Sequence, residues 1–174
     1  NAERFQAYDQ AEIDGWVGGN GGCTTSHRAM LDVIAYNKWP RTLILEDDFQ
    51  ILPGDFHAKF ESMIVEVPED WQMLYLGGHY AEKPKARVSK HVIEMARMMT
   101  TSSYAVTWQT ARLIGPNVYG SAPIDTLYYR WHLALKCYIF QPRLIVQRKS
   151  FSDLQGREMD NSACMSDTRH ENMV

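Results

Sequence analysis

The sequence predicts a single α/β domain, and three observations favour that class. Short apolar runs at residues 42–45 and 71–76 have the length of buried strands rather than of helices. The first run lies between Pro40 and Pro53 and passes straight into three acids, a pattern typical of a buried parallel strand. Apolar residues recur at helical spacing over residues 30–34, which indicates a helix ahead of the first run.

The composition supports one globular domain spanning residues 1–174. Of the 174 residues, 45% are hydrophobic and 22% are charged, which is enough for a sizeable core. A Gly-rich irregular start is expected at residues 1–22 and a polar tail at residues 157–174. The net charge of −3, with dispersed Lys and Arg, argues against a nucleic-acid partner. No apolar run approaches the ~20 residues of a transmembrane helix, so no transmembrane segment is expected. The three cysteines are odd in number and widely spaced, which favours a reducing compartment and hence a cytoplasmic location.

The most informative stretch is the acid triplet Glu46-Asp47-Asp48 at the end of the first expected strand. Three neighbouring carboxylates repel one another, and a divalent cation neutralises such a cluster. In open α/β sheets the ligand crevice lies outside the carboxyl ends of the strands, where these acids are expected. The sequence therefore predicts a metal site at the triplet, with Mn²⁺ or Mg²⁺ as the ion. The alternative is a solvated strand end whose acids cap the next helix.

A helix near the start of the chain provides a second candidate. The hydroxyls of residues 24–26 are suited to N-capping, so we expect the helix to start there and to end near residue 37. His27 and Arg28 then fall in its first turn, where the positive end of the helix dipole favours an anionic ligand such as a diphosphate. The alternative for His27 is a side chain packed on a core face.

The remaining elements follow in order. Helices are expected at residues 54–65, 111–114 and 126–135, and strands at residues 71–76, 100–106, 137–140 and 144–147. Gly77 and Gly78 end a strand, where two small residues allow a ligand to approach the backbone closely. Asp125 precedes a helix, and its default role is that of the N-cap. The basic stretch 80–91 has no hydrophobic period and predicts a surface loop, a candidate lid or acceptor-binding flap.

Several motifs occur in an order that resembles glycosyltransferase family 25. They are Gly21-Gly22-Cys23 with Ser26-His27, the run 43–48, residues 71–77, Ser103-Tyr104-Ala105, Ala111 with Leu113, Ile124-Asp125, Pro142, Gln147 and Ser152-Asp153. The resemblance covers roughly residues 3–156 and rests on this ordered co-occurrence, since each motif alone is weak. The family includes bacterial lipooligosaccharide galactosyltransferases and the related collagen galactosyltransferases.

The resemblance implies a GT-A-like fold, which is one nucleotide-binding α/β unit with a mostly parallel central sheet. The usual first strand and helix are missing or vestigial in this sequence. The implied activity is metal-dependent, inverting transfer of a hexose, galactose foremost, from a UDP-sugar to a hydroxyl of a glycan or glycoprotein acceptor. Peripheral association with the inner membrane face is left open. By position, the metal residues are Glu46, Asp47 and Asp48, and the cofactor-binding residues are Ser26, His27, Arg28, Gly77, Gly78 and Gln147.

Inversion needs one carboxylate that takes the proton from the acceptor hydroxyl. Asp125 and Asp153 are the candidates, and Asp125 is preferred because it is expected at a helix start that faces the strand ends. Two other functions stay open. One is a catalytically silent, glycosyltransferase-like domain that binds a glycan or a partner. The other is a different metal enzyme such as a phosphoesterase, although the scattered histidines lack ligand spacing.

Overall fold

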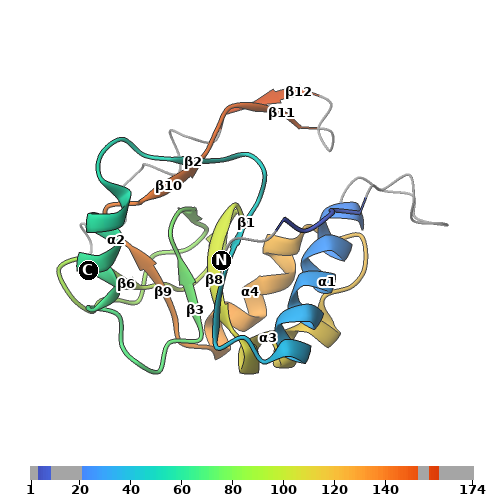
Figure 1. Cartoon of the computed structure of the whole chain (residues 1–174), viewed down its shortest axis with the longest axis horizontal. Coiled ribbons are helices and arrows are strands. Elements are labelled where there is room, and N and C mark those ends of the chain that lie inside the picture. The colour runs from blue at the N-terminus through green and yellow to red at the C-terminus, as the bar shows by residue number, and fades with distance from the viewer. Residues whose placement is uncertain (1–3, 9–20, 153–156, 161–174) are drawn as a thin grey trace.

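The computed structural model describes residues 4–8, 21–152 and 157–160, and shows helices on both sides of a central sheet (Figure 1). The α-helices of the described residues are α1 (Gly21–Asn37), α2 (Phe56–Ile64), α3 (Trp108–Ile114) and α4 (Ile124–Ala134), and a 3₁₀-helix at Gly115–Asn117 follows α3. The mixed α/β class expected from the sequence is therefore confirmed. None of these helices is both long and apolar enough to cross a membrane.

The central sheet has six strands in the order β1-β8-β3-β9-β6-β5. They are β1 (Arg41–Leu45), β8 (Ser103–Thr107), β3 (Met73–Tyr75), β9 (Cys137–Phe140), β6 (Val92–Glu94) and β5 (Ala86–Arg87). Only the β3–β9 pair of this sheet is parallel, and its other neighbours run antiparallel.

The expectation of a mostly parallel sheet is thus corrected to a mostly antiparallel one. Strands β1 and β3 run in the same direction and are connected through α2, as in a parallel unit, but β8 lies between them and runs the opposite way. Residues 76–102 contain strands and turns but no helix, so the chain returns from β3 to β8 without the crossover helix that parallel neighbours need. Strand polarity depends on these connections and is not visible in the local apolar pattern.

Strand β1 is an edge strand and not the buried parallel strand that its apolar run indicated. Its described neighbour is β8, and its residues alternate in exposure. Ile44 is 4% exposed and faces the core, whereas Leu43 and Leu45 are 40% and 39% exposed. The alternation follows from the two-residue period of a strand that is covered on one face.

Two apolar cores lie on the two faces of the sheet. On one face α1, α3 and α4 pack together, and in Figure 1 these three helices share one side of the strands. Their core includes Leu31, Ile34, Ile44, Tyr104, Ile114 and Tyr128. On the other face α2 covers a smaller core that includes Met63, Trp71, Leu76 and Phe140. Successive strand residues alternate between these two cores, as a sheet covered on both faces requires.

Three two-stranded ladders complete the described structure. They pair β2 (Phe49–Ile51) with β10 (Ile145–Gln147), β4 (His79–Tyr80) with β7 (Met98–Met99), and β11 (Ser150–Ser152) with β12 (Arg157–Met159). The β2–β10 ladder places residues 48 and 147 side by side, although they are far apart in sequence. Strand β12 lies in the part of the chain expected to be a polar tail. Strands β4 and β5 lie at or within the stretch 80–91, which was expected to be a loop.

Two helix starts differ from the expected ones. Helix α1 already begins at Gly21, so His27 and Arg28 lie in its second turn and not its first. Ser26 is inside the helix, where its hydroxyl donates to the carbonyl of Gly22 at 2.8 Å instead of capping the end. Helix α4 has Pro123 as its N-cap, so Asp125 is in the first turn and not at the cap.

Other local expectations are confirmed. The helix expected at residues 54–65 is α2 (Phe56–Ile64). The structure adds that Asp55 caps it, because the Asp55 carboxylate accepts a hydrogen bond of 3.0 Å from the amide of Ala58. Strands β9 and β10 lie on either side of Pro142, as their two apolar runs predicted. Helix α3 ends at Ile114 as expected, but its start at Trp108 differs from the expected start by three residues.

Candidate functional site

The acid triplet follows β1, as expected, but its members have different partners. Glu46 lies toward α1 and the start of β8. Its Oε1 is 3.0 Å from Nε2 of His27 and accepts a hydrogen bond of 2.6 Å from the hydroxyl of Thr101. The backbone amide of Glu46 donates to the carbonyl of Ser102 at 3.1 Å. This carboxylate is therefore fixed by contacts with two distant segments of the chain.

His27 is 5% exposed and connects Glu46 to a buried row of hydroxyl groups. Its Nδ1 is 2.9 Å from the hydroxyl of Tyr104, which is in turn 2.9 Å from the hydroxyl of Tyr128. The rings of His27 and Tyr104 also stack, with centroids 5.7 Å apart. The core-face alternative for His27 thus describes its surroundings, while its Nε2 contacts the carboxylate of Glu46, which follows β1.

The charges of His27 and Glu46 stabilise each other. Burial by itself lowers the pKa of His27, but hydrogen bonds to Cys23 and Glu46 and the nearby carboxylate outweigh it and raise the pKa to about 10. Burial likewise tends to raise the pKa of Glu46, but the hydrogen bond and charge of His27, with the Thr101 hydroxyl, lower it overall. At neutral pH the pair is an imidazolium and a carboxylate.

Cys23 joins this pair to form a group that resembles a metal site. Cys23 and His27 are four residues apart on α1, so they lie on one face of the helix. One donor atom each from Cys23, His27 and Glu46 lies within 4.8 Å of the other two. Cys23 is a donor that the sequence analysis does not predict. The spacing of the cysteines to one another does not indicate it, whereas the four-residue spacing of Cys23 from His27 does.

Asp47 and Asp48 belong to the turn that connects β1 to β2. Asp47 is exposed, while Asp48 is partly buried and its Oδ2 accepts a hydrogen bond of 2.6 Å from the side-chain amide of Gln147. The carbonyl of Asp48 also accepts a hydrogen bond from the amide of Arg148 at 2.8 Å. The structure thus brings together Asp48 and Gln147, which the sequence assigned to the same site.

Asp125 lies close to the same end of the sheet. Its Oδ2 accepts a hydrogen bond of 3.2 Å from the amide of Thr100, and its Oδ1 one of 2.7 Å from the amide of Thr126. Thr100 has a φ of 70°, a conformation that is uncommon for a residue other than glycine. Because Thr101 binds Glu46, the carboxylates of Asp125 and Glu46 contact adjacent residues of one segment.

That segment, residues 100–103, contributes buried hydroxyl groups that the sequence reasoning did not assign to a site. Within the described residues, the side-chain oxygens of Thr100, Ser102 and Ser103 are buried without a hydrogen-bond partner. Nδ1 of His79 is likewise buried without a hydrogen-bond partner among the described residues. Buried polar atoms in proteins are usually satisfied by protein, water or ligand, so these atoms mark a polar interior beside the acids. The run Thr100-Thr101-Ser102-Ser103 is the signal that could have indicated it.

The two glycines after β3 serve the packing of the chain itself. A Cβ atom at Gly77 would lie 2.0 Å from the carbonyl oxygen of Ile145, and Gly78 has a φ of 134°. The close approach expected at this strand end therefore occurs with the backbone of the β10 strand. The carbonyl of Gly78 also accepts a hydrogen bond of 3.1 Å from Nε of Arg143.

Two further candidates, Ser26 and Arg28, lie on α1, and a third, Asp153, cannot be placed. The hydroxyl of Ser26 accepts a hydrogen bond of 2.9 Å from the amide of Tyr8. Nε of Arg28 is 2.8 Å from a carboxylate oxygen of Asp32 one turn along the helix. Asp153 lies outside the described residues.

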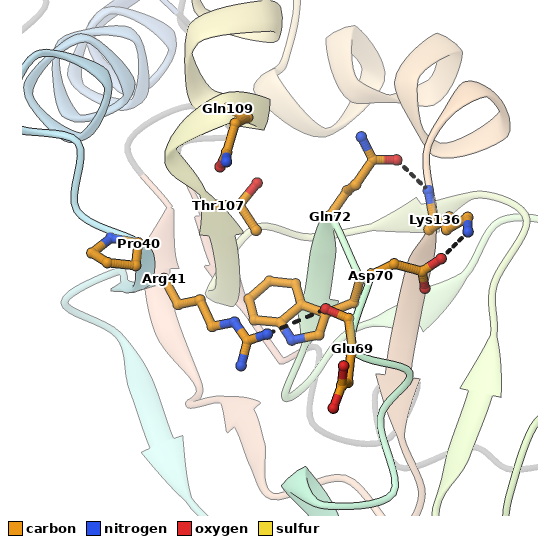
Figure 2. A pocket seen from close by; sticks show the side chains of 9 residues that line it. Pro40, Arg41, Glu69, Asp70, Gln72, Thr107, Gln109 and Lys136 are labelled. Atoms are coloured by element: carbon orange, nitrogen blue, oxygen red, sulfur yellow. Dashed lines mark hydrogen bonds and ion pairs between the residues drawn. The ribbon is translucent and has the colours of Figure 1, made fainter.

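A separate hollow lies at the opposite end of the sheet. It has a volume of about 460 Å³ and is lined by residues at the starts of β1, β3 and β9 and the end of β8 (Figure 2). The guanidinium of Arg41 lies 5.3 Å from the centre of the Trp71 ring. Figure 2 shows the ion pair between Lys136 and Asp70. None of the candidate site residues lines this hollow.

Comparison of the chain with models of known protein families gives no match, and comparison with curated proteins gives no similar sequence.

Proposed function

We propose that this domain is a metal-dependent, inverting glycosyltransferase of the family 25 type. It would transfer a hexose, galactose foremost, from a UDP-sugar to a hydroxyl of a glycan or glycoprotein acceptor. Asp47 and Asp48 would hold Mn²⁺ or Mg²⁺, and Asp125 would take the proton of the acceptor hydroxyl.

One observation carries the proposal. Four segments that are far apart in sequence meet at one end of the sheet: the acid triplet, residues 100–103, Asp125 and Gln147. The contacts that join them are those of Thr101 with Glu46, Thr100 with Asp125 and Gln147 with Asp48. This convergence supports a common site because each contact includes one residue to which the family resemblance gave a role. These residues are Glu46, Asp125 and Asp48.

The donor atoms fit a hard divalent cation at Asp47 and Asp48. Both residues supply carboxylate oxygens, which Mg²⁺ and Mn²⁺ prefer. The amide of Gln147 at 2.6 Å fixes the orientation of the Asp48 carboxylate, as outer partners of metal ligands commonly do. Glu46 is engaged by His27 and Thr101, so we assign it a positioning role beside the cation rather than direct ligation.

When bound, the cation supplies stabilisation of the negative charge on the departing diphosphate. The residues of the chain have separate tasks. Asp48 and Asp47 would bind the cation, and Gln147 would orient Asp48. Asp125 accepts the acceptor proton, an effect worth roughly 10²–10⁴ in rate.

The test is calorimetric titration of UDP into the purified protein with and without Mn²⁺, followed by the same titration of two variants. Asp48→Ala and Asp47→Ala should abolish the metal-dependent part of binding while the melting temperature stays close to that of the wild type. Asp70→Ala, at the opposite end of the sheet, is the matched control and should bind as the wild type does. Unchanged affinity in both site variants would contradict the assignment of the metal.

A second candidate function is a catalytically silent domain that binds a sugar nucleotide or glycan. The observation that favours it is that both oxygens of Asp125 already accept hydrogen bonds from backbone amides, which is a structural role. Asp125→Asn distinguishes the two functions. In an active enzyme it lowers transfer by roughly 10²–10⁴ and leaves donor affinity within a few-fold. If the domain is a silent binder, the wild-type protein itself neither hydrolyses nor transfers any UDP-sugar in the presence of metal.

A further inference from the structure

We infer that Cys23, His27 and Glu46 form a second metal site, distinct from that of Asp47 and Asp48, which binds Zn²⁺ through one sulfur, one nitrogen and one oxygen. The three donors lie within 4.8 Å of one another and come from two successive turns of α1 and the end of β1. In the described residues, no other set of three His, Cys, Asp or Glu side chains has this geometry. This inference does not depend on the proposed function.

The spacing of the donors is close to that of a tetrahedral zinc ion. Bonds of about 2.0–2.1 Å to nitrogen and oxygen place these two donors roughly 3.3 Å apart. Nε2 of His27 and Oε1 of Glu46 are 3.0 Å apart, so the ion can take the place of the proton between them after a small separation. A zinc–sulfur bond of about 2.3 Å places sulfur roughly 3.6 Å from the other donors. Because the observed limit is 4.8 Å, Sγ of Cys23 needs to approach by no more than roughly 1.2 Å.

The surroundings of these ligands match those of known zinc sites in kind. The second ring nitrogen of a zinc-bound histidine usually has its own hydrogen-bond partner. Here Nδ1 of His27 has the hydroxyl of Tyr104 at 2.9 Å, and Glu46 has the hydroxyl of Thr101 at 2.6 Å. Both partners therefore fix the ligands from outside. The side chain of Glu46 is 24% exposed, which gives an ion access from solvent.

The donor chemistry selects the ion. A thiolate and an imidazole favour zinc and other borderline metals over Mg²⁺ and Mn²⁺, whereas the carboxylates of Asp47 and Asp48 have the opposite preference. Three protein ligands leave one tetrahedral position for water, the open arrangement and not the closed four-ligand one. Two neighbouring sites would thus bind different classes of cation.

The experiment measures zinc binding by competition with a chromogenic chelator, on the full chain after metal removal. The wild type should bind one equivalent that Cys23→Ser weakens by at least roughly 100-fold, since loss of a direct ligand exceeds the 10–100-fold cost of losing an outer partner. Cys137→Ala, at a buried cysteine on β9, is the matched control and should retain binding. Co²⁺ in place of zinc should give a thiolate-to-metal absorption band in the wild type that is absent from Cys23→Ser.

The Cys23→Ser variant separates zinc binding from folding and from cation binding at Asp47 and Asp48. Cys23→Ser is nearly isosteric and only partly buried, and circular dichroism verifies that it is folded. Asp48→Ala should leave zinc binding intact, and Cys23→Ser should leave Mn²⁺-dependent UDP binding intact, so the two proposals fail separately. A wild type that binds no zinc, or a Cys23→Ser variant that binds it as tightly as the wild type, would overturn the inference.

Discussion

The contact between His27 and Glu46 gives the most decisive prediction about stability. We expect His27→Gln to lower the free energy of unfolding of the metal-free protein at pH 7 by about 3 kcal/mol. Removing one partner of a buried ion pair costs roughly 3–5 kcal/mol, because the other charge stays buried without compensation. The lower end applies here because 24% of the Glu46 side chain is exposed and solvent screens it in part.

Urea denaturation of the wild type, His27→Gln, Glu46→Gln and the double variant measures this coupling. The double variant should lose less stability than the sum of the two single variants, because the second change removes a charge that the first left unpaired. Asp32→Asn is the control, since it breaks the exposed pair with Arg28 and should cost only about 0.3–0.5 kcal/mol. Additive losses, or a cost below about 1 kcal/mol for His27→Gln, would refute the reasoning.

The pH dependence of stability gives a second check on the same pair. The pKa of His27 is raised from 6.5 to about 10, so the folded protein binds the proton more tightly than the unfolded chain does. The stabilisation is therefore complete below pH 6.5 and is lost as the pH rises through about 10. In His27→Gln this loss between pH 6.5 and 10 should be absent.

Three further predictions concern the framework of the site. Gly77→Ala should destabilise the protein by about 1–3 kcal/mol or more in thermal unfolding, since its Cβ would lie 2.0 Å from the backbone oxygen of Ile145; a melting temperature equal to that of the wild type would contradict this packing. Asp55→Ala should cost about 1 kcal/mol through loss of the α2 cap, and Asp55→Asn should recover most of it. Hydrogen bonds from Ser89 and His91 lower the pKa of Glu66 to about 2, so an NMR titration of its carboxyl carbon should have its midpoint there; the stabilisation it gives is present above pH 4.5 and is lost as the pH falls through about 2.

The acid triplet contributes to both proposed metal sites. The resemblance placed the metal at the acid triplet, and the geometry divides the triplet into Glu46, which contacts α1 and Thr101, and Asp48, which contacts Gln147. The triplet therefore connects two candidate sites of different donor chemistry. Measuring Mn²⁺-dependent UDP binding and zinc binding on the same set of variants tests whether the two are separate.

Local sequence was sufficient to predict much of this protein. The mixed class, the α2 helix, and the two strands on either side of Pro142 all depend on residues within a few positions of one another. The position of the acid triplet after a strand follows from an uninterrupted apolar run. Backbone preferences and apolar periodicity act over such short distances, so a single stretch of sequence contains their whole cause.

Tertiary structure alone decided the direction of the strands and the partners of the site residues. The insertion of β8 between β1 and β3 made the sheet mostly antiparallel, and β1 became its edge strand. The partner of Glu46 lies 19 residues away and that of Asp48 lies 99 residues away. No local pattern records such contacts, because each depends on how several connections fold back upon one another. The same reason explains Gly77, whose lack of a side chain is required by a carbonyl group that reaches it only in the folded chain.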